Sequence, residues 1–422
     1  MKILLIVADS LRYDYLGCYN PERSTRTLDA LAREGCVFES AFSSAPWTVP
    51  ALASLLTGLW AHRLGIVSWA QGWRPFTPTL FDYFGERGFT RASFVFEPRH
   101  PFFRSSRADV VCSSQEPEQV AAWLRAHRRD RYVAFLHYWW THIPYMERKL
   151  ERRLWRRLAL EMLAPLGAPE RSAVELHRER LRRLYAEAVV SFSEKYLPMF
   201  VEAAQPDVLV LTADHGESWG ERMPGGSAPK RIFDLHGCHL HDEVLRIPLI
   251  FYAPELLPRG RRVRGVARSV DVLPTLLEIA GLRGDGQMTG RSLLPAMEGG
   301  SVPEDRIAFF ARNRSFEEGA PLPSRAADLY EEMGCRSGDC KVLKRIDTGE
   351  VRGYNLREDP FEEEPFPLEG GFPSTGLPAS LEKEFLRLAE ALEEEIQRAV
   401  VGRLSEEETA LMRKQLEDLG YL

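Results

Sequence analysis

The sequence has few cysteines and no long apolar run, and each shortage narrows the class of protein. Its six cysteines lack the paired spacing of a disulfide framework, although Cys335 and Cys340 stand close enough to pair or to share a metal. The opening apolar run, Met1 to Ala8, meets Asp9 instead of a cleavage site, and no run approaches the roughly 18 residues of a membrane span. We therefore expect a cytoplasmic protein with reduced thiols and no transmembrane segment.

A large excess of charge is also absent. The chain of 422 residues carries 61 acidic and 55 basic side chains, a net charge of −6, so we expect no nucleic-acid partner. Hydrophobic residues make up 44% of the sequence and charged residues 27%. Such a composition is ordinary for a globular protein and predicts a large core in at most two domains.

Apolar strands and helical patterns alternate along the first two thirds of the chain. Continuous apolar runs at Lys2 to Val7, Tyr132 to Tyr138 and Asp207 to Leu211 are typical of parallel strands covered on both faces. Helical patterns at Leu28 to Glu34 and Thr79 to Arg87 come between them. The alternation predicts an α/β fold, in which ligands bind beyond the carboxyl ends of the strands.

Polar residues follow two of these strands directly. Asp9 ends the first, and Asp214 and His215 leave the third together, before a glycine that permits a tight turn. Adjacent carboxylate and imidazole groups at such an edge can hold one divalent cation. An aspartate that only caps the following helix is the alternative for Asp9.

The stretch Ser44 to Gly58 places a hydroxyl where a helix is expected to begin. Pro46 blocks helix before Thr48, Pro50 suits a first helical turn, and Gly58 ends the pattern. Thr48 either caps the helix or, if other groups support it, attacks a phosphate or sulfate ester held at the helix N-terminus.

Histidines gather in two loops. In the first loop, His142 lies four residues after the second strand, in the sequence THIPY. In the second loop, three histidines, His236, His239 and His241, lie before an apolar strand predicted at Ile247 to Tyr252. Three clustered histidines suggest a metal site, with chance clustering as the alternative. For the isolated His142 the alternative is a purely structural role.

The segment from Glu147 to about residue 190 differs from its surroundings because it is rich in arginine and glutamate. Leu150, Leu154, Leu158 and Met162 recur at a spacing of four, which predicts an amphipathic helix followed, after a break at Ala164 to Pro169, by a second one. We expect a helical hairpin inserted in the main fold. Its basic face could meet an anionic membrane or a partner, or be simply a solvated surface with Glu–Arg pairs.

Together these motifs resemble the alkaline phosphatase and sulfatase superfamily. The matching stretches are VADSLRYD, PWTVPALASLLTG, THIPY, TADHGES, the pair His236–Gly237, DEVLRIPLIFYAP, DVLPTLLEIAGL, GRSLLP, NLREDP and the terminal LSEEETALMRKQLEDLGYL. The resemblance implies a large, mainly parallel sheet flanked by helices, with a small C-terminal antiparallel sheet and a closing helix. We expect a catalytic domain at 1–300, with the insertion at about 147–190, and the small sheet with its helix at 301–422.

The resemblance also implies roles for single residues. Asp9, Asp214 and His215 match the metal-ligand positions, and Thr48 occupies the nucleophile position and completes the metal site. His142, His236 and Arg12 are assigned to substrate binding, with the two histidines also catalytic as groups that hold substrate oxygens or protonate the leaving group. We expect one divalent ion, with Zn, Mn, Mg and Ca not distinguished. A second ion is not favoured, because Trp140 stands where a carboxylate is usual.

Thr48 also separates two chemistries. Sulfatases oxidise a cysteine or serine in the pattern C/S-x-P-x-R to formylglycine, whereas this sequence reads Thr48, Val49, Pro50, Ala51, Leu52. Threonine cannot make that aldehyde, but its alkoxide can attack phosphorus. We therefore expect a hydrolase or transferase of phosphate mono- or diesters with a small-molecule substrate. A sulfuric ester hydrolase and a catalytically silent binding protein are the alternatives, and the oligomeric state is not readable.

Overall fold

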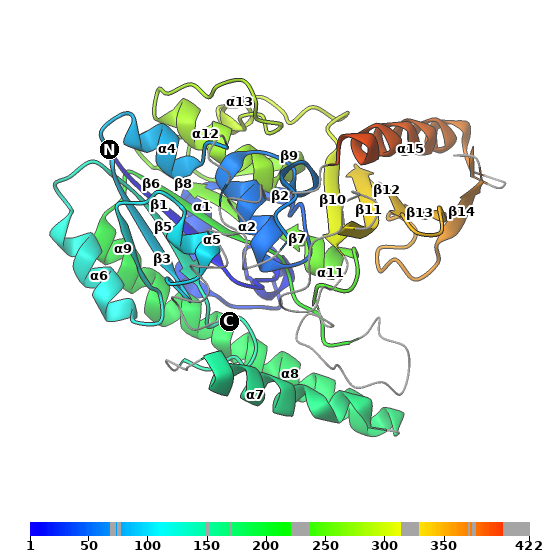
Figure 1. Cartoon of the computed structure of the whole chain (residues 1–422), viewed down its shortest axis with the longest axis horizontal. Helices are drawn as coiled ribbons and strands as arrows, with labels where there is room; N and C mark the ends of the chain where they lie inside the picture. Colours follow the sequence, from blue (N-terminus) through cyan, green and yellow to red (C-terminus); the bar gives the residue numbers. More distant parts are fainter. Residues whose placement is uncertain are drawn as a thin grey trace, which may run out of the picture.

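The computed structural model describes residues 1–67, 73, 77–147, 152–168, 170–220, 236–313, 329–369, 372–373 and 377–399. The sequence motif at 404–422 lies outside these described residues. Two sheets organise the molecule, a nine-stranded sheet with helices on both faces and a smaller antiparallel sheet beside it (Figure 1). The predicted fold class is confirmed.

The large sheet is mixed but mainly parallel. Its strands are ordered β4 (Val110–Ser113), β3 (Thr90–Val95), β5 (Tyr132–Tyr138), β1 (Lys2–Ala8), β6 (Val208–Ala213), β8 (Leu249–Tyr252), β2 (Cys36–Phe42) and β7 (Arg246–Ile247), and β9 (Arg261–Arg268) pairs with β2. The first five strands run parallel, whereas β8 is antiparallel to both β6 and β2. The sheet direction therefore changes after β6.

Strand β1 lies at the centre because it is apolar on both faces. It pairs in parallel with β5 on one side and β6 on the other, and Val7 is in register with His137 and with Thr212. From Ile3 to Ala8 its side chains are at most 1% exposed. The carboxyl ends of the three strands consequently meet at one edge of the sheet, the edge at which Asp9 and Asp214 follow.

Helices cover the two faces of this sheet. Helix α6 (Pro117–Ala126) packs on α9 (Leu197–Ala204), and α9 also contacts α1 (Arg26–Glu34). Separately, α2 (Thr48–Thr57) contacts α12 (Val272–Ile279). Figure 1 shows α6 and α9 on one side of the strands and α12, α13 (Leu294–Met297) and α4 (Leu80–Gly85) on the other. This three-layer arrangement buries the apolar strands on both faces.

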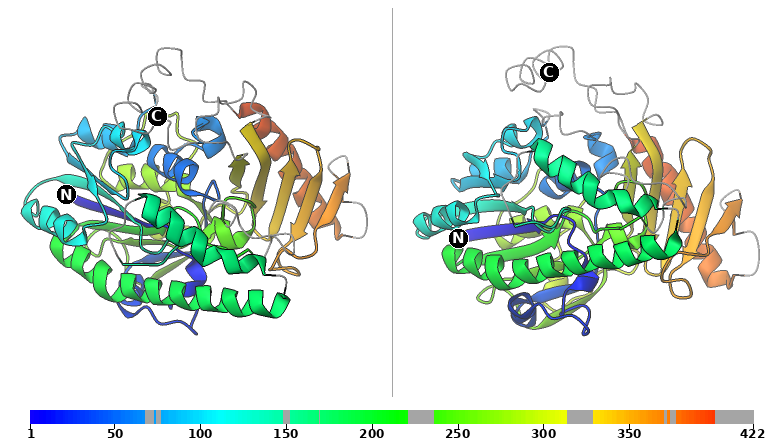
Figure 2. Two further views of the ribbon diagram at one scale, coloured as in Figure 1. Left: turned by 60° about the horizontal axis from the view of Figure 1, so that its bottom comes forward. Right: turned by 90° about the horizontal axis from the view of Figure 1, so that it is seen from below.

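The predicted helical insertion is present as α7 (Arg152–Leu163) and α8 (Arg171–Ser191), joined through a short 3-10 turn at Ala164–Gly167. The two helices lie side by side along one flank of the molecule (Figure 2), and His177 Nε2 lies 2.8 Å from the carbonyl oxygen of Met162. A π-helical turn, Phe192–Tyr196, continues α8 into α9. The hairpin is thus anchored to a core helix at its C-terminal end.

The C-terminal part forms the small antiparallel sheet. Its strands follow sequence order: β10 (Ala308–Asn313), β11 (Tyr330–Ser337), β12 (Cys340–Arg345), β13 (Val351–Asn355), β14 (Phe366–Glu369) and β15 (Phe372–Pro373). Helix α15 (Ala379–Arg398) buries Phe385, Leu388 and Leu392 against it. Cys335 and Cys340 face other partners across β11 and β12, and they form no disulfide.

Two buried contacts join the small sheet and its helix to the large domain. The backbone N–H of Ala311 in β10 donates to the carbonyl of Ser44, which lies just before α2. On α15, the carboxylate of Glu395 lies 2.9 Å from Nε2 of His62 and also accepts from Arg63, both in α3 (Ala61–Leu64). The C-terminal helix is therefore tied by charge to the segment that follows α2.

One sequence expectation needs adjustment. The strand predicted at Ile247 to Tyr252 is divided at Pro248, which has no N–H to donate to a ladder, so β7 ends before it and β8 begins after it. The predicted domain boundary near residue 300 falls between α13 and β10. Among the described helices, none combines the length and apolar character that crossing a membrane requires.

Candidate active site

Three of the predicted metal ligands meet at the carboxyl edge of β1 and β6. One ligand atom each from Asp9, Asp214 and His215 lies within 4.8 Å of the others, and all three side chains are buried. Ser10 shapes this corner: its φ of 57° is unusual for a residue other than glycine, and its N–H donates to Asp214 Oδ1 at 3.1 Å. The turn after β1 is thereby fastened to the turn after β6.

Thr48 brings the fourth predicted ligand into the same cluster. It is the first residue of α2, after an extended Trp47, and its side chain is almost fully buried. Its Oγ1 lies 3.3 Å from His215 Nε2 and 3.4 Å from Asp9 Oδ2. The hydroxyl therefore faces the cluster, whereas a simple helix cap would turn it back to the backbone.

The donor set fits a divalent cation. Two carboxylates, one imidazole and one hydroxyl supply the oxygen and nitrogen ligands that such ions accept. Asp214 Oδ2 is buried without a hydrogen-bond donor among the described residues, 3.5 Å from Nε2 of both His137 and His215. A buried carboxylate oxygen of this kind is costly unless a positive charge compensates it, and a cation would do so.

His137, in β5, is a member of the cluster that the sequence analysis missed. Its Nε2 lies 3.1 Å from Asp9 Oδ2, and the residue is completely buried. Burial alone would lower the pKa of His137, but the hydrogen-bonding and charged carboxylates of Asp214 and Asp9 raise it to about 9. Conversely, burial would raise the pKa of Asp9, and the nearby histidines hold it well below its usual range. No signal in the sequence indicated this contact, because it depends on the register of β5 beside β1.

The two histidines assigned to the substrate lie on the same side of the cluster. The ring centroid of His236 is 4.5 Å from that of His215 and 5.2 Å from that of His142. Both residues are only 4% exposed, and burial lowers their pKa values, that of His236 to about 3 with help from the charge of His215. Neutral imidazoles can therefore face a substrate here without adding charge.

A buried hydrogen-bonded chain holds His236 in place. Glu217 Oε1 lies 2.9 Å from His236 Nδ1, Tyr145 donates to Glu217 Oε2 at 3.0 Å, and Trp219 Nε1 donates to the Tyr145 hydroxyl at 2.9 Å. Burial raises the pKa of Glu217 to about 7, opposed by His142 and His215. Sequence reasoning overlooked Glu217, although it stands within the TADHGES motif.

Arg12 lies beside the cluster, and its guanidinium already forms hydrogen bonds with other protein groups. Its guanidinium forms a two-point ion pair with Asp14 and donates to the carbonyl oxygen of Glu217 at 3.1 Å. Its backbone N–H donates to the Tyr185 hydroxyl, which in turn donates to the carbonyl of Ser10. In this arrangement Arg12 braces the strand ends, and its assignment to substrate binding stays a prediction.

A small, largely aromatic pocket opens beside His142. Its lining residues are Phe96, Gln115, Trp139, Trp140, His142, Pro144, Met146 and Trp155. Trp139 stacks on His142 with ring centroids 4.6 Å apart, and Trp155, from the inserted helix α7, donates to the carbonyl of Ile143. Trp140 stands at the position where the resembling family usually has a carboxylate. Its ring packs on Tyr196, and it offers no ligand for a second ion.

Comparisons with known proteins agree with this architecture. The Sulfatase family matches residues 2–123. An uncharacterized sulfatase from Escherichia coli (strain K12) is 22% identical over 86% of this chain and 82% of its own length, and a delta 4,5-hexuronate-2-O-sulfatase from Bacteroides thetaiotaomicron is 21% identical over 86% and 83%. The solved phosphonate monoester hydrolase from Silicibacter pomeroyi superposes with a TM-score of 0.70, at 18% identity, covering 96% of each chain.

The large mixed sheet flanked by helices is the fold of these structural neighbours. The Sulfatase match over residues 2–123 and the similarity to sulfatases over most of the chain support the resemblance to the alkaline phosphatase and sulfatase superfamily. At the position that this resemblance assigns to the nucleophile, the chain has Thr48.

Proposed function

We propose that this protein hydrolyses, or transfers the phosphoryl group of, small phosphate mono- or diesters, with Thr48 as the nucleophile and one divalent cation as cofactor. The observation that carries the proposal is the position of the Thr48 hydroxyl, buried among Asp9, His215 and the end of β1. The N-terminus of α2 adds free N–H groups and a positive dipole end, which favour an anionic ester at this place.

Each residue then has a distinct task. Asp9, Asp214, His215 and Thr48 would hold the cation, which when bound supplies positive charge against the charge that develops on the transferred group. Thr48 Oγ1 attacks phosphorus, the bond to the leaving oxygen breaks, and a phosphoryl-threonine forms. Water then cleaves that ester to release phosphate, or an acceptor alcohol takes the phosphoryl group. His142 or His236, neutral before the reaction, takes up the proton that Thr48 gives up and passes it to the leaving oxygen.

Thr48 favours phosphorus over sulfur for a chemical reason. A formylglycine hydrate releases sulfate by collapsing to an aldehyde, without further attack at sulfur. A threonine has no second hydroxyl on the reacting carbon, so a sulfated Thr48 would wait for water to attack sulfur. A solved relative that hydrolyses phosphonate monoesters indicates that this fold accommodates phosphorus chemistry.

Sulfate ester hydrolysis is the second candidate, because several of the relatives are sulfatases. They include the delta 4,5-hexuronate-2-O-sulfatase and an N-acetylglucosamine-6-O-sulfatase, both from Bacteroides thetaiotaomicron. In this case Thr48 would have to act by a different route from that of the formylglycine enzymes.

A matched substrate pair separates the candidates. We expect kcat/KM for an aryl phosphate, mono- or diester, to exceed that for the corresponding aryl sulfate by at least about 100-fold, roughly 2.7 kcal/mol in barrier. The enzyme is assayed with Mg, Mn, Zn and Ca in turn, and Thr48→Ala is the control that must abolish turnover while circular dichroism shows the fold retained. A sulfate preference that Thr48→Ala abolishes would overturn the phosphoryl proposal and keep the site.

Complete absence of turnover on both ester classes, with the cation bound, would favour the catalytically silent alternative. Cytoplasmic location and the lack of a nucleic-acid partner remain predictions from the sequence, which cell fractionation and a binding assay with DNA can test.

A further inference from the structure

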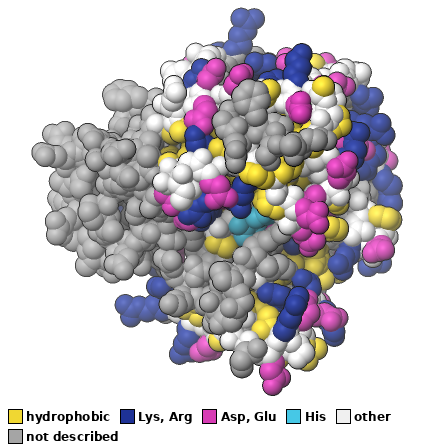
Figure 3. All heavy atoms as spheres, turned by 90° about the vertical axis from the view of Figure 1, so that its right-hand side faces the viewer, with side chains coloured by type: hydrophobic (Ala, Val, Ile, Leu, Met, Phe, Trp, Pro, Cys, Tyr) yellow, Lys and Arg dark blue, Asp and Glu magenta, His cyan; other side chains and the backbone are white. Residues whose placement is uncertain are grey.

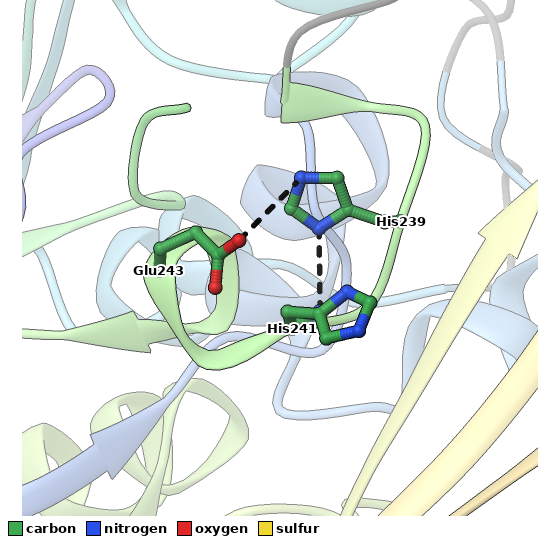
Figure 4. Close-up of side chains that lie close together, drawn as sticks. All are labelled: His239, His241 and Glu243. Atoms are coloured by element: carbon green, nitrogen blue, oxygen red, sulfur yellow. Dashed lines mark hydrogen bonds and ion pairs between the residues drawn. The ribbon is translucent and has the colours of Figure 1, made fainter. Parts of the chain in front are cut away.

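A second group of metal-binding side chains lies outside the site described above. His239 and His241 precede the short helix α11 (Asp242–Leu245), and Glu243 lies within it. One ligand atom from each of the three lies within 4.8 Å of the others. Figure 4 shows His239 next to both Glu243 and His241, with His239 Nε2 3.9 Å from Glu243 Oε1.

We propose that His239, His241 and Glu243 form a second divalent-cation site, of the kind that binds zinc. Neither the proposed phosphoryl chemistry nor the Asp9–Asp214–His215 cluster uses any of these side chains. Two imidazoles with one carboxylate suit Zn²⁺, whereas Mg²⁺ and Ca²⁺ prefer oxygen ligands alone. Three protein ligands leave a fourth position for water.

One of the three separations between ligand atoms is close to that which a shared ion requires, and the others lie within 4.8 Å. Ligands about 2.0–2.1 Å from a tetrahedral zinc lie roughly 3.4 Å apart. The 3.9 Å separation between His239 Nε2 and Glu243 Oε1 must therefore shrink by only about half an ångström. His239 is 6% exposed and Glu243 is partly exposed, so the site is sheltered but has an entry path.

The backbone that carries the three ligands is held by the residues between them. Leu240 is buried in an apolar cluster with Val244, Phe310 and Leu343. Asp242 pairs with Arg336 and, at 3.0 Å, with Lys341, both in the small sheet. Such support lowers the entropy that ordering the ligands would otherwise cost.

One hydrogen bond must be exchanged when the cation binds. The backbone N–H of His241 donates to Nδ1 of His239 at 3.4 Å, which places the ring proton on Nε2. Binding through Nε2 moves this proton to Nδ1 and gives up that long hydrogen bond, a cost of about 1 kcal/mol or less. His239 only changes tautomer and releases no net proton, so the exchange balances.

The proposed second site also lies next to the turn that carries Asp214 and His215. Gly216 follows His215, its N–H donates to the carbonyl of Val244, and a Cβ on Gly216 would lie only 2.0 Å from the carbonyl oxygen of Glu243. His236 stands three residues before His239. A bound cation would therefore stiffen the segment from His239 to Glu243, which packs on the turn that carries Asp214 and His215.

Metal stoichiometry tests this inference without reference to the reaction. The protein is stripped with a chelator, incubated with zinc chloride, passed through a desalting column and analysed for zinc by mass spectrometry. We expect two equivalents per chain for the wild type, and one for His239→Gln/His241→Gln. Asp214→Ala should also retain one equivalent, because its second site is intact. The control His127→Gln/His177→Gln, on other helices, should retain two.

Thermal stability provides an independent test of zinc binding at the second site. Zinc should raise the melting temperature of Asp214→Ala but leave that of a His239→Gln/His241→Gln/Asp214→Ala variant unchanged. If the double histidine variant fails to fold, Glu243→Gln, which preserves side-chain volume, should bind the second zinc at least about 100-fold more weakly. A zinc content that is the same in the double histidine variant as in the wild type, or unchanged affinity in Glu243→Gln, would each overturn the proposal. If the proposed phosphoryl chemistry proved wrong, the zinc affinity of the second site would be unaffected.

Discussion

Replacing Glu217 by glutamine tests whether the buried chain behind His236 supports catalysis. The carboxylate faces donors on both oxygens: Tyr145 and the backbone N–H of Ser218 donate to it, and His236 Nδ1 lies 2.9 Å from Oε1. Glutamine keeps the shape but offers one acceptor oxygen and one donor NH₂. Two arrangements of the amide are possible, and each mismatches one partner.

In the first arrangement the amide oxygen faces His236 and the NH₂ faces Tyr145. The Tyr145 oxygen already accepts from Trp219 Nε1, so its own proton loses the acceptor that Glu217 provided. In the second, the NH₂ faces His236 and the N–H of Ser218, which forces the His236 proton onto Nε2. Either arrangement loses a buried hydrogen bond, worth about 1–3 kcal/mol.

We therefore expect Glu217→Gln to lower kcat/KM by roughly 5- to 150-fold, the range that 1–3 kcal/mol represents. The assay is steady-state hydrolysis of the best aryl ester, with metal content measured on the same sample so that cation loss is not mistaken for a misplaced histidine. Tyr145→Phe is the matched control: it removes one donor but leaves the Glu217–His236 contact, so its loss should be smaller. A folded, metal-loaded Glu217→Gln enzyme within twofold of the wild type would refute the reasoning.

Three further predictions follow from other parts of the molecule. Asp214→Ala should lose the catalytic-site cation, measured as one equivalent less metal, whereas Thr48→Ala should keep it at reduced affinity. Trp155→Ala should raise KM for an aryl ester about 5- to 10-fold with little change in kcat, because the ring lines the pocket beside His142; an unchanged KM would show that the insertion does not contact substrate. Glu395→Gln should lower the free energy of unfolding by about 2 kcal/mol at pH 7, after allowance for partly exposed arginine partners. Although burial would raise the pKa of Glu395, hydrogen bonds from His62 and Arg63 lower it from 4.5 to about 2, so its contribution is present above about pH 4.5 and is lost as pH falls towards 2. Urea unfolding at several pH values measures this, and a difference from the wild type that did not shrink on acidification would contradict it.

The sequence was most informative where the chemistry of neighbouring residues is local. The strand predicted at Tyr132 to Tyr138 has those bounds in the structure, since its continuous apolar run can only be buried. Asp9, Asp214 and His215 were identifiable because each follows a strand directly, and parallel strands share one edge. The small C-terminal sheet was expected from family resemblance alone.

Contacts that depend on strand register were not readable. His137 stands in an apolar strand, where a histidine is ordinarily a core residue, and only the pairing of β5 with β1 brings it to Asp9. Glu217 contacts His236 and Tyr145, which lie in two other loops, and no spacing along the chain connects the three residues. Pro248 could have been used to divide the last predicted strand, since proline interrupts a ladder.

The central position of β1 has a consequence for how the protein is made. The ribosome completes this strand first, but its neighbours β5 and β6 begin only at Tyr132 and Val208. Until they emerge, both edges of a highly apolar strand lack their native partners, a condition that promotes aggregation. Stalled or truncated chains that end before Val208 should therefore depend on chaperones.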